Sequence, residues 1–411
     1  MHIECTNFTP IVDTLDHLPP LPLFVRYDHL PSNFTTGVTE KDKLLGTCHA
    51  LRLYGRVRHI ELFLLPSTWH EVVALLDEQF PMLEHLQVAF SSLDPSKNSL
   101  PLTLPKAFLA PNLRHLALPS LSPPRRLRLL TSTVSLVTLA LSNIQTSGYF
   151  RPRLLVARLR SLPLLEELFI GFSTPIPRPS TERKRLGEQG APITLPSLKN
   201  FRFEGVSAYL ESLIVQIRAP LLKRIWITLF NQIAFALPHS SRLINITEAF
   251  KLPFAVVCFD RGEVYLTTDF GPHRDSDTWG AFRFHVICTP LDWQIDCAAQ
   301  ICTALIPTLS CIENLRISHG HQDTPTELRN GGIDSATWHE LLRSFIGLKE
   351  LYITGSEPLL EELSRALQVD EVGSDPGLLP NLRSIHAKDN RFTSFIDGRR
   401  AVGRPVEFVK W

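Results

Sequence analysis

The chain has 411 residues, of which 44% are apolar, and its 42 basic and 41 acidic residues nearly cancel. This balance gives no support for binding to nucleic acid or to an anionic membrane surface, both of which attract basic proteins. No run of 18 apolar residues is present, and the first residues lack the basic and apolar regions of a secretory signal. We therefore predict a cytoplasmic or nuclear protein with no membrane association.

The N-terminal segment, residues 1–50, carries no repeat and is predicted to cap the repeat array that begins after it. Residues 21–27 (LPLFVRY) predict a strand. The first unit of a repeat array would otherwise expose its apolar core, which is why such arrays begin with a cap.

From residue 57 onward, ten short windows repeat one pattern: apolar, two variable residues, apolar, one variable residue, apolar. Their first residues are Val57, Leu83, Leu113, Leu136, Leu165, Leu198, Leu222, Ile312, Leu348 and Leu382. Consecutive windows lie 23 to 36 residues apart, except for one interval of 90 residues. A strand motif at this period is typical of leucine-rich repeats, in which each unit stacks on the next to bury its apolar side.

Helices are expected between the windows, at 68–80, 207–217 and 358–367, and again where Thr-Trp-His-Glu recurs at 337–340. In the first of these, the apolar residues fall on one helical face. Thr68 followed by Glu71 fits a capping box, in which the two residues satisfy the free backbone N–H groups of a helix start.

The 90-residue interval contains two β-rich segments, FAVVCF at 254–259 and FRFHVIC at 282–288. Strands at these positions restore a period near 30 residues. A third segment, VYLTT at 264–268, follows the first across Asp260-Arg261-Gly262, which predicts a hairpin turn. We interpret the interval as two degenerate repeats, one of them decorated with a hairpin.

The predicted fold is α/β: an irregular leucine-rich-repeat solenoid, or horseshoe, with a parallel curved sheet and helices on its convex side. The solenoid covers 51–400 with a hairpin insert at about 250–290, and 401–411 is a C-terminal tail. The Asn that ties down the turn in the common consensus occurs only at Asn390, so no continuous Asn ladder is expected.

Longer polar loops are predicted at 172–194, 269–280, 320–335 and 368–378. The first contains Arg183-Lys184-Arg185, which fits a localisation signal and, more simply, a solvated loop.

No catalytic, cofactor-binding or metal-binding motif emerges. His70-Glu71 and His339-Glu340 each begin the HExxH zinc motif, but Ala74 and Arg343 stand where its second His is needed. The seven cysteines match no zinc spacing, and their odd number favours free thiols in a reducing compartment. Cys297 and Cys302 are more simply core residues than nucleophiles.

If the window residues point inward, the residues between them form two outward columns, which face the concave side. The first column reads His59, His85, His115, Thr138, Glu167, Asn200, Arg224, Asn314, Glu350 and Ser384. The second reads Glu61, Gln87, Ala117, Ala140, Phe169, Arg202, Trp226, Arg316, Tyr352 and His386. Three histidines stack at one end, which is compatible with a metal site or a pH switch and, more simply, with exposed strand residues.

Aromatic and arginine residues gather elsewhere in the columns, and such residues dominate the binding energy of protein interfaces. The candidate partner-binding residues are Phe169, Arg202, Arg224, Trp226, Arg316 and Tyr352. The alternative is that they are ordinary solvated strand residues, covered in part by the long loops.

Several stretches resemble the F-box/leucine-rich-repeat-like proteins of mushroom-forming fungi, in an order and spacing that span about residues 20 to 400. They are LPLFVRYD (21–28), GRVRHIEL (55–62), LDEQFPMLEHL (76–86), LAPNLRHLALPS (109–120), FEGVSAYLESLIVQIRAPLL (203–222), LFNQIAFALP (229–238) and LDWQIDCAAQIC (291–302). The resemblance implies repeats that select a protein for ubiquitination, and an F-box that docks the Skp-type adaptor of a cullin-RING ligase. An F-box is helical, whereas the segment from Leu18 to Pro22 is too rich in proline for a helix interior. The resemblance therefore covers the repeat portion.

We therefore expect a non-enzymatic protein-recognition module with an unknown protein partner. Two alternatives remain open. One is a repeat scaffold with no role in ubiquitination, and the other is an enzyme with a site in the 254–302 insert, for which the sequence supplies no matched nucleophile and base.

Overall fold

The computed structural model describes residues 2–5, 19–29, 40–90, 102–121, 129–145, 148–173, 191–230, 234–260, 262–269, 280–288, 291–319, 335–368 and 378–410. The chain divides into two compact units, which we describe separately. Unit 1 comprises Met1–Glu204 and Gln216–Leu221, and unit 2 comprises Gly205–Val215 and Leu222–Trp411.

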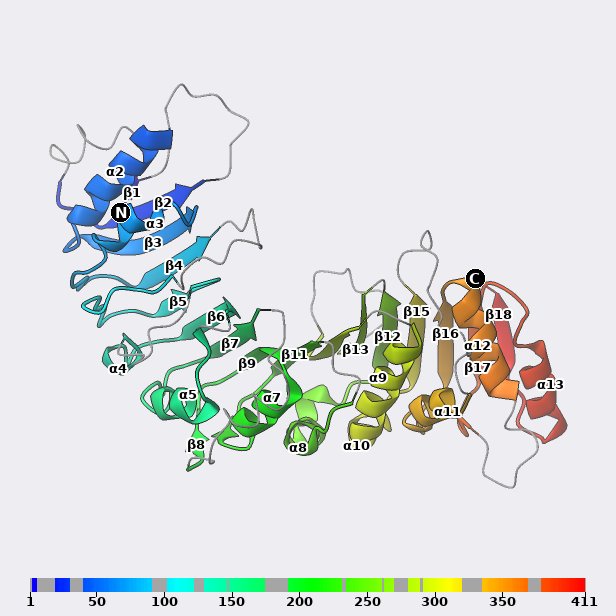
Figure 1. Cartoon of the computed structure of the whole chain (residues 1–411). Coiled ribbons are helices and arrows are strands. Elements are labelled where there is room, and N and C mark those ends of the chain that lie inside the picture. The colour runs from blue at the N-terminus through cyan, green and yellow to red at the C-terminus, as the bar shows by residue number, and fades with distance from the viewer. Residues whose placement is uncertain are drawn as a thin grey trace. The chain divides into compact units, whose positions relative to one another are not determined.

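Unit 1 contains a parallel sheet whose strand order follows the chain (Figure 1). Its described strands are β1 (Ile3–Cys5), β2 (Leu23–Asp28), β3 (Val57–Leu64), β4 (His85–Phe90), β5 (His115–Ala117), β6 (Thr138–Ile144), β7 (Glu167–Phe172) and β9 (Asn200–Gly205). Its described helices are α2 (Glu40–Arg52), α3 (Trp69–Val73), α4 (Leu129–Ser132) and α5 (Pro152–Leu159). Two short strands, β8 (Ile193–Thr194) and β10 (Ile217–Arg218), form a separate parallel pair.

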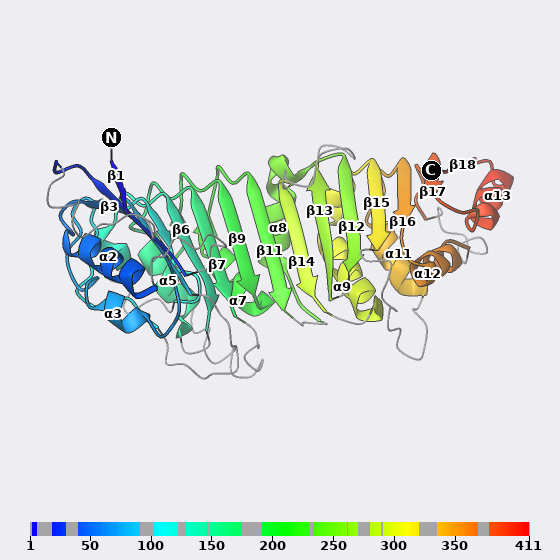
Figure 2. The ribbon, with the colours of Figure 1, turned by 90° about the horizontal axis from the view of Figure 1, so that it is seen from above.

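Unit 2 contains a second run of strands in the order β11-β14-β13-β12-β15-β16-β17-β18. Their bounds are β11 (Arg224–Phe230), β12 (Phe254–Asp260), β13 (Glu263–Asp269), β14 (Phe282–Ile287), β15 (Asn314–His319), β16 (Glu350–Thr354), β17 (Ser384–Ala387) and β18 (Glu407–Lys410). Its described helices are α7 (Ser207–Ile214), α8 (Pro238–Ile246), the 3₁₀ turn η2 (Glu248–Phe250), α9 (Leu291–Ala304), α10 (Ile306–Leu309), α11 (Ser335–Arg343), α12 (Glu357–Gln368) and α13 (Thr393–Ala401). Figure 2 looks onto these strands, with α8, α9 and α11 behind them.

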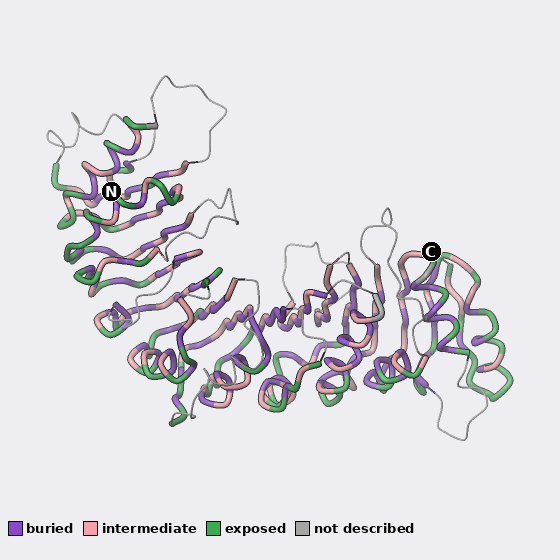
Figure 3. The backbone as a smooth tube through the Cα atoms, viewed as in Figure 1, coloured by how far each residue is buried: buried purple, intermediate pink, exposed green. Residues whose placement is uncertain are grey.

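The structure is thus mixed α/β, and the sheet is mostly parallel and closes into a barrel in neither unit. The predicted windows fall on its parallel strands, in register. Leu139 pairs with Leu168, which pairs with Phe201, and all three are buried. Buried and partly exposed residues alternate along many of the strands, as in β3 and β9 (Figure 3). Each buried Leu or Ile contributes about 1.5–3 kcal/mol to folding.

The two strands predicted inside the 90-residue interval lie in the sheet of unit 2, as β12 and β14. Their order is the reverse of the chain order, because β12 pairs with β15 and β14 pairs with β11, both in parallel. The predicted hairpin is confirmed, since Asp260 pairs with Glu263 across the turn. Its second strand, β13, was expected as a decoration but lies within the sheet, antiparallel to both neighbours.

This reversed insert has a simple geometric basis. A two-residue turn forces β12 and β13 to be antiparallel neighbours. A third strand then restores the original direction, so both outer strands of the insert run parallel to the strands they meet. Helix α9 packs against β12, β13 and β14 and carries the chain back to β15. The side-chain amide of Gln294 on α9 donates to the carbonyls of Asp260 (2.7 Å) and Cys288 (3.0 Å).

A side-chain ladder connects the turns that precede the strands. Asn112 donates to the carbonyl of Pro81 (2.7 Å) in the preceding turn, and Ser197 donates to that of Pro163 (2.9 Å). In unit 2, Asn381 donates to Ile346 in the same way (2.9 Å). These bonds satisfy carbonyls at the start of the repeats, whereas the consensus Asn acts after the strand.

One glycine shows how closely successive turns approach. Gly347 occupies the ladder position in its turn, and a Cβ there would lie 2.4 Å from the carbonyl oxygen of Ser310. Any side chain at this position would therefore require the backbone of one of the two turns to shift. By contrast, Asn390, the one match to the consensus, is exposed, and its carbonyl accepts a hydrogen bond from the Thr393 hydroxyl.

The helix expected over 68–80 is shorter than predicted. It ends at Val73 and turns follow, although Trp69, Val72, Leu76 and Phe80 of the predicted apolar face are buried. The predicted capping box is wrong, because the Thr68 side chain makes no cap hydrogen bond and its hydroxyl donates to the carbonyl of Leu65 (2.9 Å). The helices predicted at 207–217, 337–340 and 358–367 correspond to α7, α11 and α12.

Both ends of the chain contribute to the sheet. Within 1–50, the strand predicted at 21–27 is β2, and β1 pairs beside it while α2 packs against both. Residues 401–411, expected as a tail, contain β18, which pairs with β17. The predicted loop basic cluster Arg183-Lys184-Arg185 lies outside the described residues. In the described part of the chain, no helix has the length and apolar character needed to cross a bilayer.

Adjacent leucines at the start of one repeat test this burial pattern. Leu165 is 0% exposed and Leu164 is 52% exposed. Leu165→Ala should lower the free energy of unfolding by about 2–5 kcal/mol because it leaves a cavity. Leu164→Ala should change it by less than about 0.5 kcal/mol. Urea unfolding of both variants measures the difference, and equal losses would contradict the assigned register.

Candidate functional site

We call the side of each sheet that bears the residues alternating with the buried window residues its open face. The predicted outward columns exist there. In unit 1, His59, His85, His115, Thr138, Glu167 and Asn200 are successive register partners. In unit 2, Asn314 pairs with Glu350 and Arg316 with Tyr352.

Phe169 and Arg202 are neighbours on the open face of unit 1. They pair across β7 and β9, and the guanidinium carbon of Arg202 lies 4.3 Å from the centre of the Phe169 ring. Arg202 also forms an ion pair with Glu204 (2.6 Å). The arginine is therefore held by a stacked ring and a carboxylate, and all three side chains are half-buried.

The densest group on the open face of unit 2 is the sandwich cluster, formed by Trp226, Tyr265, Arg283, His285 and Glu263. Arg283 lies between two rings, its guanidinium carbon 5.0 Å from the Trp226 ring centre and 4.6 Å from that of Tyr265. The Tyr265 ring meets His285 edge-on, and His285 Nε2 lies 2.7 Å from the Glu263 carboxylate. Burial raises the pKa of the Tyr265 hydroxyl, so it remains a neutral donor.

A second group lies on β15, β16 and β17. Arg316 pairs with Tyr352, whose ring stacks on His386 with centres 4.3 Å apart. The Tyr352 hydroxyl donates to the Glu350 carboxylate (2.6 Å). Burial and this hydrogen bond raise the pKa of Tyr352 to about 12. This group therefore presents the Arg316 guanidinium and the stacked rings of Tyr352 and His386 on the open face.

The structure brings the predicted site residues together only in part. Phe169 contacts Arg202, and Arg316 adjoins Tyr352, whereas Arg224 is exposed at the start of β11. Three strands, β14, β13 and β12, separate Trp226 from Arg316 within unit 2. At about 4.8 Å per strand, this places the two side chains roughly 19 Å apart along the sheet. The six residues therefore do not form one patch.

Sequence reasoning missed Arg283, Tyr265 and His285, which fill the space beside Trp226. A signal was present, because Phe-Arg-Phe-His-Val at 282–286 alternates strictly, as does Val-Tyr-Leu-Thr at 264–267. The outward columns contain residues of the windows alone, and the degenerate strands of the insert carry no window.

The three predicted histidines form part of a longer stack on the open face of unit 1. His59 and His85 stack at 4.1 Å between ring centres, and His85 and His115 lie 5.7 Å apart. Phe24 stacks on His59 and His2 stacks on Phe24. Within the described ranges, no group of three or more His, Cys, Asp or Glu side chains is arranged to hold a metal ion.

The other sequence candidates for chemistry have structural roles. His339 is buried, and its Nε2 hydrogen bonds to the carbonyl of Ala366 on α12 (2.6 Å). Cys297 and Cys302 are both buried. A hydrogen bond with Cys288 and burial raise the pKa of the Cys297 thiol, and burial raises that of Cys302. A nucleophilic cysteine needs a lowered pKa and access to substrate.

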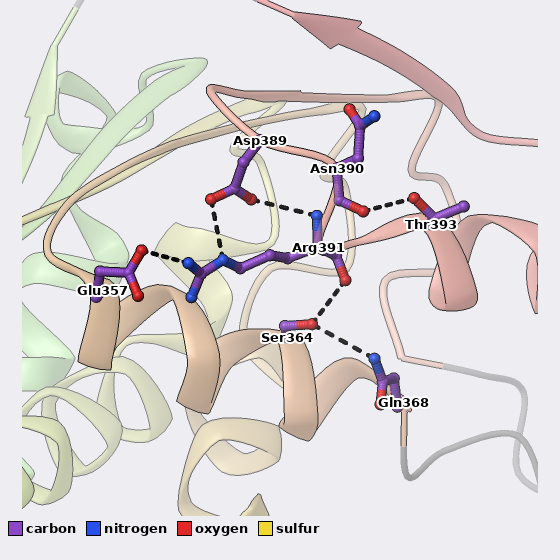
Figure 4. Close-up of polar contacts among 7 residues, drawn as sticks. All are labelled: Glu357, Ser364, Gln368, Asp389, Asn390, Arg391 and Thr393. Atoms are coloured by element: carbon purple, nitrogen blue, oxygen red, sulfur yellow. Dashed lines mark hydrogen bonds and ion pairs between the residues drawn. The ribbon is translucent and has the colours of Figure 1, made fainter.

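The polar cluster around Arg391 also connects structural elements (Figure 4). Its guanidinium pairs with Glu357 on α12 and with Asp389 (3.0 Å), and its carbonyl accepts a hydrogen bond from Ser364 (2.9 Å). Ser364 in turn accepts one from Gln368. These contacts hold the segment after β17 against α12, away from the open-face rows.

Comparison with known proteins adds no assignment: no protein-family model matches the chain, and no curated protein matches it.

The thiols give a direct test of this description. All seven cysteines lie in the described residues and are thiols; Cys311 is exposed, Cys48 is half-buried and the other five are buried. A disulfide-exchange reagent should label one thiol rapidly in the native chain and all seven after denaturation without reductant. Cys311→Ser should abolish the rapid phase. Fewer than seven thiols in the denatured chain would contradict the prediction.

Proposed function

We propose that the chain is a solenoid of the leucine-rich-repeat type and acts as a non-enzymatic protein-recognition module, resembling the substrate-binding part of an F-box-like protein. The observation that carries this proposal is the sandwich cluster on the open face of unit 2, with Arg283 between Trp226 and Tyr265. The solenoid assignment is supported by the repeat period and by the in-register parallel strands within each unit.

Recognition is supported by the kind of residue that the open face presents. Trp, Tyr and Arg are the residues most enriched where interfaces gain most of their binding energy. A guanidinium stacked on aromatic rings is also restrained before a partner arrives, so less side-chain entropy is lost on binding. The same arrangement recurs in unit 1, where Arg202 stacks on Phe169.

The rival interpretation as an enzyme would place chemistry in the 254–302 insert. Its open-face thiol, Cys258, is buried, and burial raises its pKa above the ordinary value, which opposes nucleophilic attack. The scaffold interpretation differs from the ligase interpretation only in whether the bound partner is ubiquitinated. Finding the bound partner ubiquitinated in cells would favour the ligase role over the scaffold.

Partners can be captured by proximity labelling with the full chain and then purified for calorimetry. Trp226→Ala should weaken binding of such a partner about thirtyfold, because truncating an anchor of this kind costs about 2 kcal/mol. The fold should lose less than about 1.5 kcal/mol, mainly the contact with Arg283. The inward-pointing Leu222→Ala should instead lose about 2–5 kcal/mol of stability.

Tyr54→Ala is the matched control, because Tyr54 is 42% exposed and lies in the turn before β3, off the open face. It should leave partner affinity unchanged. Equal binding by Trp226→Ala and the parent chain would overturn the proposed surface.

We predict that this 411-residue chain alone does not bind a Skp-type adaptor. Leu23–Asp28 is a strand paired with β1 and β3, not part of a helical docking segment. We therefore expect no retention of the chain on an immobilised Skp-type adaptor at micromolar concentration. A known F-box protein serves as the positive control, and clear retention of this chain would refute the prediction.

A further inference from the structure

Five rings form a continuous stack on the open face of unit 1, and we call it the ring column: His2, Phe24, His59, His85 and His115. The centre-to-centre distances along it are 4.0, 5.1, 4.1 and 5.7 Å. The first three pairs are nearly parallel, with interplanar angles of 15°, 19° and 7°. The column thus connects β1 to β5 through side chains on neighbouring strands.

The column contributes side-chain contacts to the two outermost strands, β1 and β2. Among the described residues, β1 pairs with β2 over three positions, Ile3 to Cys5. On β2, Phe24 is stacked between His2 and His59, and the register of β2 with β3 shifts beside it. Ring contacts therefore supplement a short and irregular set of backbone pairings at this edge.

The charged surroundings of the column are mixed. The titratable or charged side chains that face it are Glu4 on β1, Arg26 on β2, Glu61 on β3 and Glu167 on β7. Arg26 is paired with Glu61 (3.2 Å), and Arg58 on β3 pairs with Glu84 (2.9 Å), which directly precedes β4. At the far end, Nδ1 of His115 is hydrogen bonded to the Thr138 hydroxyl (3.1 Å). No carboxylate lies between adjacent imidazoles to separate their charges.

We infer that the ring column makes the pairing of β1 and β2 sensitive to protons: charging its imidazoles at mildly acidic pH separates the rings and releases these two edge strands. Neutral imidazoles stack favourably, whereas two imidazolium rings at 4.1 Å repel each other across a partly desolvated gap. Repulsion can be relieved most easily at the edge, where one side of the column is free to move.

The direction of the pH effect follows from linkage. Burial, together with neighbouring His and Arg charges, lowers the pKa of His59, and burial with His59 and His115 lowers the pKa of His85 to about 4. The unfolded chain, with ordinary His pKa values near 6.5, therefore takes up protons first as the pH falls. Stability contributed by the column is complete above about pH 6.5 and declines as the pH falls toward about 4.

Hydrogen exchange of the full chain, read by mass spectrometry and corrected for intrinsic rates, tests the inference. Between about pH 7.5 and about pH 5, protection of peptides covering β1 and β2 should fall at least about tenfold, since the His85 shift exceeds one pKa unit. Peptides covering β16 in unit 2 should keep their protection. Return to neutral pH should restore the protection of β1 and β2.

Variants then identify the groups responsible. The triple variant His59→Phe, His85→Phe and His115→Phe keeps aromatic rings at these positions and removes their proton uptake, which leaves His2 as the one imidazole of the column. Its edge strands should therefore lose little protection between the two pH values. His386→Phe is the matched control, because His386 also stacks on an open-face ring but lies in unit 2, and its acid response should equal that of the parent. If the triple variant does not fold, His85→Phe alone should reduce the response.

Acid-stable protection of β1 and β2 in the parent chain would overturn the inference. So would an undiminished acid response in the folded phenylalanine variants, because the proton uptake would then reside elsewhere.

Discussion

The in-register parallel pairing of the window strands is the constraint on which the other features depend. Each window buries its apolar residues on one side of the sheet, as Leu139, Leu168 and Phe201 do in neighbouring strands. A slip of one residue would turn every buried side chain outward, so the apolar pattern fixes the register strongly. Once the register is fixed, the residues between must form columns on the open face. The ring column and the Phe169–Arg202 pair are direct consequences of that alternation.

The reversed insert shows how additional strands can enlarge the open face without loss of this register. Three antiparallel strands, β12, β13 and β14, enter between β11 and β15, and their outer members meet both neighbours in parallel. Trp226 gains its neighbour Arg283 from β14, and Arg283 gains its second ring from β13. The proposed recognition surface is thus built largely by the segment in which the repeat pattern is weakest.

Local pattern in the sequence was sufficient to predict most strands of the sheet, the side on which their residues lie, and four of the described helices, α3, α7, α11 and α12, because alternation and spacing are properties of neighbouring residues. It also placed Phe169 beside Arg202 and Arg316 beside Tyr352. It did not reveal the order of the insert strands, since which strand pairs with β11 depends on contacts between residues far apart in the chain. The capping box at Thr68 failed because its hydroxyl bonds to Leu65. The turn ladder of Asn112 and Ser197 was missed because its acceptors are main-chain carbonyls, which carry no sequence signal.

The strand order of the insert is the central structural claim, and cross-linking to the native Cys258 tests it directly. Cys258 on β12 is the register partner of Ser318 on β15, whereas Thr228 on β11 pairs with His285 on β14. Neighbouring strands hold Cα atoms within the 4.4–6.8 Å that a disulfide requires. Under mild oxidation, Ser318→Cys should form a disulfide with Cys258, identified by peptide mapping, and Thr228→Cys should not. A Cys258 cross-link to position 228 and none to position 318 would show that β12 follows β11 directly, and would contradict the reversed order.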